Sequence, residues 1–159
     1  MKPTNNIGYL LQHTSFSMAR QSDQVLQEQL GIGLSQFKIM MVLRWSSNMQ
    51  QRQIADALGQ TEASISRQIK LMHDQNLLQT TISPQNRREH ITTLTAKGLR
   101  MTQEALKVLN RYHAPTFAVL TEKQQKQFVD ILKLLHGEVC KGERPGRCYL
   151  NYLDSLERN

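Results

Sequence analysis

Apolar residues recur at helical spacing along most of the chain, and one short extended stretch interrupts them. Over about residues 6–29, Leu11, Met18 and Val25 return at intervals of seven residues. This spacing predicts an amphipathic helix with one apolar side. Glycines follow directly and end the pattern.

Two further helices are predicted next along the chain. The first covers about residues 36–46, with Ser35 as its N-cap. Apolar residues surround much of this helix, Trp45 included, so we expect it to be buried on several sides. The second is short, about residues 51–58, and Gly59 provides its C-terminal stop.

A fourth helix begins after Thr61, a residue type that caps helix N-termini well. Ile65, Ile69 and Met72 fall within a narrow arc of its helical wheel and are predicted to face the core. Asn76 is expected to end it, because Asn tolerates the left-handed conformation common after helices.

Two threonine-rich extended segments, residues 77–83 and 89–94, flank the turn-prone basic stretch 84–88. This pattern is typical of a β-hairpin. The order helix, short helix, tight turn, helix and hairpin is the winged helix-turn-helix arrangement. We therefore predict a mainly α fold with a small β-hairpin wing, in one continuous domain.

Two long helices are predicted in the C-terminal part. One runs from Thr95 to about His113, and Pro115 is expected to interrupt or end it. The other begins at Thr121 with a capping box. On the first of these helices, the residues expected to face inward are Leu99, Thr102, Leu106, Leu109 and Tyr112. The second should carry a stripe of Phe128, Ile131, Leu132 and Leu135.

The charge balance narrows the class of partner. The chain of 159 residues has a net charge of +7 and a pI near 9.7, with both signs mixed along it. A basic domain of this size favours a polyanion, and nucleic acid before a membrane. A signal peptide and a bilayer-spanning apolar run are both missing from the sequence, and its two cysteines suit a reducing compartment. We expect a cytoplasmic protein with no membrane partner.

The fourth helix carries residues suited to DNA on the side opposite its apolar arc. Arg67 can contact guanine with two hydrogen bonds, and Ala63 can meet a thymine methyl group. Lys70 and the flanking serine hydroxyls suit phosphate oxygens. Taken alone, this face is more typical of a solvated amphipathic helix. A basic hairpin tip directly after a helix-turn-helix is placed to enter the adjacent minor groove, and this combination favours DNA binding. The predicted DNA-binding residues are Thr61, Ala63, Ser64, Ser66, Arg67, Lys70, Arg87 and Arg88.

The segment from Leu58 to Gly98 resembles the core of the MarR family. Asn86-Arg87-Arg88 stands at the family's wing motif, Asp-x-Arg, and Leu94-Thr95-Ala96-Lys97-Gly98 matches its Leu-Thr-x-x-Gly at the expected spacing. Ser64-Ile65-Ser66-Arg67 matches the recognition helix, and Asn76-Leu77 stands where the family generally has Gly-Leu. One residue departs from the family: Asn86 replaces an Asp that is expected to steady the wing, and Asn keeps a hydrogen bond but not the charge.

The resemblance implies a two-fold dimer that places two recognition helices and two wings on a pseudo-palindrome, with Arg88 as the wing arginine. Residues 32–98 would form the DNA-binding core, 5–31 and 99–137 the dimerisation helices, and 138–159 a tail. The expected partners are double-stranded DNA, a second copy of the chain and a small-molecule effector. In the family, phenolic or carboxylate ligands commonly bind between the dimer helices and the DNA-binding core. Polar or aromatic residues that suit such a ligand here are His13, Ser17, Arg20 and Trp45.

Some residues are typical of other functions. His136 and Cys140, four apart, resemble half of a zinc site, but the sequence offers no second close pair, so we expect no metal and no cofactor. Cys140 and Cys148 are an alternative input as a thiol-based redox sensor. An architectural winged helix that compacts DNA is another alternative. Phosphate loops and a nucleophile elbow are missing from the sequence, so we do not expect an enzyme.

Overall fold

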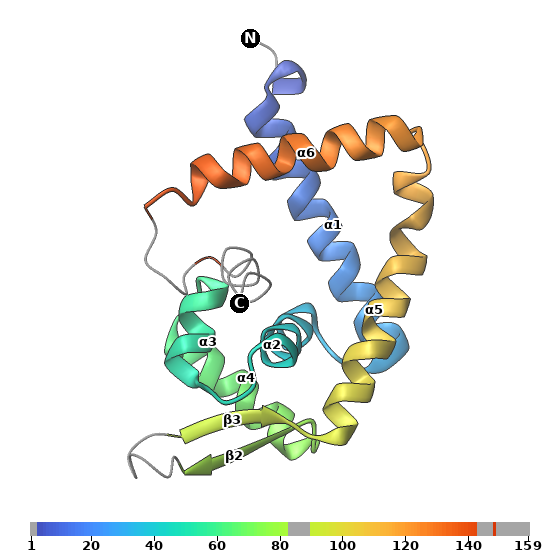
Figure 1. The fold of residues 1–159 in the computed structure, drawn as a ribbon. Helices are drawn as coiled ribbons and strands as arrows, with labels where there is room; N and C mark the ends of the chain where they lie inside the picture. The colour runs from blue at the N-terminus through green and yellow to red at the C-terminus, as the bar shows by residue number, and fades with distance from the viewer. Residues whose placement is uncertain (1–2, 83–89, 143–147, 149–159) are drawn as a thin grey trace.

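A computed structural model describes residues 3–82, 90–142 and 148 (Figure 1). These residues form helices and three short strands. After a short turn at Pro3–Asn5, the helices are α1 (Ile7–Leu30), α2 (Leu34–Trp45), α3 (Gln51–Leu58), α4 (Glu62–Asp74), α5 (Ala96–Phe117) and α6 (Glu122–Val139). The strands are β1 (Met49–Gln50), β2 (Leu78–Ile82) and β3 (His90–Leu94). The predicted fold class, mainly α with a small β wing, is confirmed.

Local capping chemistry sets most helix boundaries. Thr61 and Thr121 accept hydrogen bonds from the backbone N–H groups three residues ahead, as predicted. Gly59 and Asn76 take left-handed conformations, with φ of 60° and 57°. These residues satisfy donors or relieve strain at positions where a helix must stop.

The predicted cap of α2 is wrong. The N-cap is Gly33, not Ser35, and α2 begins at Leu34. The Leu34 N–H donates to Asp23 Oδ1 at 2.7 Å, across from α1, while the Gly33 N–H donates to the Gln36 side chain at 2.9 Å. A carboxylate from a neighbouring helix thus supplies the acceptor that a local serine was expected to supply.

The predicted end of α5 is also wrong, because the helix continues through Pro115 to Phe117. Proline removes one backbone donor and costs stability inside a helix. Here the loss falls within the last turn, and the Ala118 N–H resumes the ladder by donating to the Ala114 carbonyl at 3.0 Å. Only the last residues of α5 therefore follow the proline that was expected to interrupt or end the helix.

The inward face of α5 differs from the predicted one. Leu99 and Tyr112 are exposed, and the buried positions are Gly98, Thr102, Ala105, Val108 and His113. These are mostly small residues that let α5 approach α1 and α2 closely. The large apolar residues beside them, Leu106 and Leu109, pack at the edge of the core.

The three strands form one antiparallel sheet in the order β1–β3–β2. β2 and β3 pair from Leu78↔Leu94 to Ile82↔His90, which gives the predicted hairpin. β1 pairs with β3 through two residues only. A strand this short has no readable alternation, so its place in the sheet depends on a distant partner that the sequence pattern does not indicate.

The core is formed mainly by residues of α1, α2, α3, α4, α5 and β2, while α6 stands apart from it. Among the described residues of α6, none is buried. Figure 1 places α6 across α1, at the end of the molecule opposite the β2–β3 hairpin. Trp45, expected to be buried in α2, is 51% exposed. None of the described helices is long and apolar enough to cross a membrane.

Candidate nucleic-acid interface

Burial of one side of α4 determines which side faces solvent. Ile65 and Met72 are fully buried and Ile69 is nearly so. Ala63, Arg67 and Lys70 lie on the opposite side and are exposed, together with Ser66 on one flank. Neither Arg67 nor Lys70 forms an ion pair with any described residue. Both charges are therefore available to a ligand, on a helix anchored by its apolar side.

The first turn of α4 is held by a short hydrogen-bond chain. The Ser64 N–H donates to Thr61 Oγ1 at 3.2 Å, and the Ser64 hydroxyl donates to Gln60 Oε1 at 3.3 Å. The side chain of Ser64 is consequently half-buried and turned toward the α3–α4 turn, unlike that of Ser66. Thr61 and Ser64 thus position the positive end of α4, which favours nearby phosphate.

Sequence reasoning missed one exposed residue on this surface. Leu71 is 52% exposed and lies one turn after Arg67. Leucine at helical spacing is usually read as core, which is why the sequence did not single it out. Its angular position is a usable signal, because Leu71 falls well outside the arc of Ile65, Ile69 and Met72. An exposed apolar side chain here can contact a thymine methyl group.

The root of the wing is bound to the end of α4 by residues at the start of α5. The Thr95 hydroxyl donates to the Asn76 carbonyl at 2.8 Å and also lies 3.2 Å from the Leu77 carbonyl oxygen. Lys97 Nζ donates to the Gln75 carbonyl at 2.8 Å. Gly98 lies so close that an added Cβ would collide with the Leu77 carbonyl oxygen. The Leu-Thr-x-x-Gly motif therefore serves to join α4, β2 and α5.

The wing tip itself lies outside the described residues. Arg87 and Arg88, and Asn86 beside them, belong to the segment that joins the paired residues Ile82 and His90. The antiparallel pairing places both ends of that segment at the end of the hairpin away from α5. The predicted roles of these three residues remain predictions.

The four predicted ligand residues are not brought together. His13 stacks on Tyr9 with ring centroids 5.9 Å apart, and Arg20 is exposed further along α1. Trp45 lies under the Arg44 guanidinium at 5.8 Å, and Ser17 is half-buried. None of the four lines either of the two grooves described next.

Two apolar grooves lie where α6 meets the rest of the chain. The α1–α6 groove, of 310 Å³, is lined by Ile7, Leu10, Leu11, Thr14, Phe128, Ile131, Leu132 and Leu135. The α5–α6 groove, of 510 Å³, shares some of these residues and adds Ser15, Met18, Thr116, Phe117, Val119 and Leu120. Two predicted stripes, on α1 and α6, thus face each other across a partly open apolar surface.

The helix-turn-helix of α3 and α4 with its paired wing defines the chain as a winged helix-turn-helix protein. Residues 32–90 match the model of the MarR family. This match covers the winged-helix core, which is therefore similar to the MarR family. The match and the fold together support a DNA-binding transcriptional regulator. A comparison with curated protein sequences gave no significant match.

Solved structures of MarR-type proteins have the same fold. Wild-type MarR from E. coli, in its apo form, superposes with a TM-score of 0.75 at 17% identity, over 82% of this chain and 96% of that chain. CouR from Rhodococcus jostii RHA1, bound to p-coumaroyl-CoA, gives 0.73 at 17% identity over 91% and 98%. The transcriptional repressor CouR bound to a 23-mer DNA duplex gives 0.74 at 21% identity over 84% and 94%.

Proposed function

We propose that this chain is a sequence-specific transcriptional regulator that binds a pseudo-palindromic operator as a homodimer and responds to a small aromatic or carboxylate ligand. The observation that carries the proposal is the free, basic face of α4, held on its buried side and at its capped N-terminus. The DNA-bound structure of CouR, a protein of the same fold, supports it.

Each residue of the proposed DNA surface has a chemical role. Arg67 reads guanine with two hydrogen bonds, and Ala63 contacts a thymine methyl group. Thr61, Ser64, Ser66 and Lys70 lie near phosphates and set the register of the helix. Arg87 and Arg88 enter the neighbouring minor groove, which attracts arginine where it is narrow and A·T-rich.

The dimer is proposed from apolar surface that the monomer leaves uncovered. α6 has no buried residue among those described, and Ile7, Val119 and Leu134 are each more than 70% exposed. Burying a large apolar side chain stabilises by roughly 1.5–3 kcal/mol. A second copy seated on α1, the end of α5 and α6 covers this surface and sets two α4 helices about one turn of DNA apart.

A pair of matched substitutions tests the dimer. Ile131 lines the α1–α6 groove and is 52% exposed, whereas Val129 is 48% exposed on the opposite side of α6. Ile131→Lys should shift the sedimenting species toward monomer, and Val129→Lys, with the same charge added, should not. A wild-type chain that sediments as a monomer at micromolar concentration would refute the dimer.

Selection of bound DNA from a random pool tests the DNA proposal. The recovered site should be a pseudo-palindrome. Arg67→Ala should relax the preference at one base position per half-site and weaken the free energy of DNA binding by about 1–3 kcal/mol. Lys123→Ala is the control, since that exposed lysine lies in the first turn of α6, away from the wing (Figure 1). Recovery of no common motif, with broad protection in footprinting, would support an architectural protein instead.

The effector is proposed to bind in the α5–α6 groove. Its 510 Å³ suits a small molecule, and its lining combines Thr14, Ser15 and Thr116 with apolar side chains that suit an aromatic ring. CouR bound to p-coumaroyl-CoA supports an aromatic ligand in this fold. A ligand that prefers the DNA-incompetent spacing by ~1–3 kcal/mol lowers DNA affinity roughly 5–150-fold.

Titration of the DNA complex with salicylate-like acids and, separately, with peroxide tests whether an aromatic acid or an oxidant controls DNA binding. Aromatic acids should release DNA from the wild type and from the Cys140→Ser/Cys148→Ser chain alike. Thr116→Val, which removes one groove hydroxyl, should weaken the acid's effect and leave DNA affinity in its absence unchanged. If peroxide alone releases DNA, and only when the cysteines are present, the thiol-sensor alternative is correct.

A further inference from the structure

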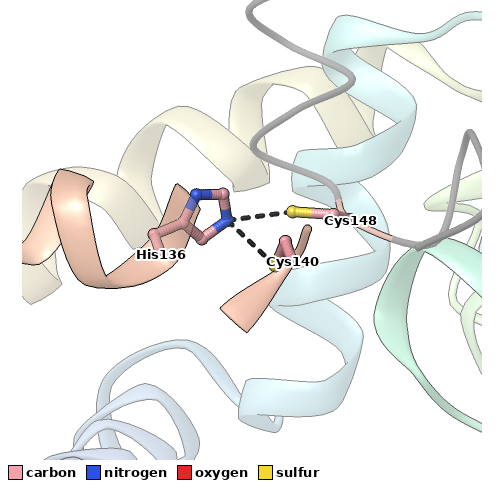
Figure 2. A group of neighbouring side chains, drawn as sticks. All are labelled: His136, Cys140 and Cys148. Carbon is pink, nitrogen blue, oxygen red and sulfur yellow. Dashed lines mark hydrogen bonds between the residues drawn. The ribbon is translucent and has the colours of Figure 1, made fainter. Parts of the chain in front are cut away.

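Three metal-ligating side chains converge at the C-terminal end of α6 (Figure 2). His136 lies in the last turn of α6, Cys140 is its C-cap residue, and Cys148 returns from eight residues further along the chain. His136 Nε2 is 2.9 Å from Cys148 Sγ and 3.4 Å from Cys140 Sγ. All three ligand atoms lie within 4.8 Å of one another.

Both sulfurs lie near the same imidazole nitrogen. A neutral imidazole nitrogen carries either one lone pair or one proton, so His136 Nε2 makes a conventional hydrogen bond to one of the two sulfurs at a time. A metal ion between the three atoms bonds to all of them. Tetrahedral zinc, with Zn–S near 2.3 Å and Zn–N near 2.0–2.1 Å, separates a ligand sulfur and nitrogen by about 3.5 Å. The observed separations lie within about 0.6 Å of that value.

We propose that His136, Cys140 and Cys148 form a zinc site with three protein ligands and solvent in the fourth position. Two thiolates and an imidazole favour Zn²⁺ over hard cations such as Mg²⁺ or Ca²⁺. Binding displaces the two thiol protons to solvent, and His136 binds as the neutral imidazole. Cys148 is buried, while His136 and Cys140 are half-buried, so the site is sheltered but reachable.

Only half of this group could be predicted from the sequence, because His136 and Cys140 are four residues apart at the end of one helix, whereas the approach of Cys148 does not follow from local spacing. The bound ion ties the segment that carries Cys148 to the end of α6. Since α6 is proposed to form part of the dimer interface, zinc occupancy becomes a second influence on that region. The metal site itself does not depend on the DNA-binding proposal.

The test is metal binding by the full-length protein kept reduced with a phosphine, so that a disulfide cannot block the site. Each chain should bind one Zn²⁺, as measured by elemental analysis after dialysis. Titration with Co²⁺ should give a thiolate-to-cobalt charge-transfer band and the intense visible absorption of tetrahedral cobalt. Cys140→Ser, Cys148→Ser and His136→Gln should each weaken Co²⁺ binding by more than the ~10–100-fold typical of losing an outer hydrogen-bond partner.

His90→Gln is the control, because this exposed histidine lies on β3 outside the cluster, and it should keep one ion per chain. Added Zn²⁺ should raise the unfolding temperature of the wild type and of His90→Gln, but not of the cysteine variants. Two results would overturn the site: reduced protein that gives no thiolate–cobalt band, or metal binding that survives all three substitutions. Circular dichroism of each metal-free variant separates loss of the site from loss of the fold.

Discussion

Replacing Gly98 by alanine should damage the joint between α4, β2 and α5. Alanine is the better helix former by about 0.8–1.0 kcal/mol, so at an open helical position the change stabilises. At Gly98 the new Cβ would collide with the Leu77 carbonyl oxygen and crowd a methyl group of Leu94. The obstructing atom is backbone, which cannot turn away as a side chain can.

The size of the effect follows from what must move. The Leu77 carbonyl accepts from the Thr95 N–H at 3.1 Å and lies 3.2 Å from the Thr95 hydroxyl. Displacing it weakens both contacts, at about 0.5–1.5 kcal/mol each, and overpacking adds about 1–3 kcal/mol. After the gain in helix propensity, we expect Gly98→Ala to lower the free energy of unfolding by about 1–5 kcal/mol.

Gly137 offers a matched control, since it lies in α6 and an added Cβ there meets nothing within 4 Å. Gly137→Ala should raise stability by about 0.5–1 kcal/mol. Urea unfolding of both variants at one fixed protein concentration measures the difference, because dimer stability depends on concentration. The reasoning fails if Gly98→Ala is as stable as the wild type while Gly137→Ala behaves as expected.

Three further substitutions have defined outcomes. Lys70→Ala should weaken binding to all DNA sequences alike and lower the slope of log affinity against log salt by about one per chain, as read from fluorescence anisotropy at several salt concentrations; an unchanged slope would place Lys70 away from phosphate. Thr92 is fully buried and its hydroxyl has no partner among the described residues, so Thr92→Val should raise the free energy of unfolding by about 1 kcal/mol in urea; a loss would mean that the hydroxyl is bonded. Pro115→Ala should restore a helical hydrogen bond. This should raise the free energy of unfolding by about 1–3 kcal/mol and with it the unfolding temperature, and a lower unfolding temperature would contradict the prediction.

Features that depend on neighbouring residues could be predicted from the sequence. The caps at Thr61 and Thr121 and the left-handed Asn76 follow from side-chain chemistry within one turn. The exposed face of α4 follows from the periodicity of its apolar residues. The predicted division into a core at 32–98, flanking dimerisation helices and a tail stays a prediction, as do the roles of the site residues.

Features that depend on distant residues could not be predicted in this way. Asp23 caps α2 from another helix, and β1 exists only because Met49 and Gln50 pair with β3. Cys148 reaches His136 across a stretch whose sequence has no helical or extended period. In each case the decisive contact joins segments whose spacing along the chain carries no periodic pattern.

The joint at Thr95, Lys97 and Gly98 has a mechanical consequence. Because it ties α4 and the root of the wing to one end of α5, we expect these parts to move together when α5 tilts. With 22 residues, α5 is roughly 33 Å long. A tilt of about 10° around its far end sweeps the tip through roughly 6 Å, more than the ~3.4 Å rise of one base pair. In the proposed DNA complex, a small rotation where α5 meets α6 would therefore move α4 and the wing out of register with the major groove.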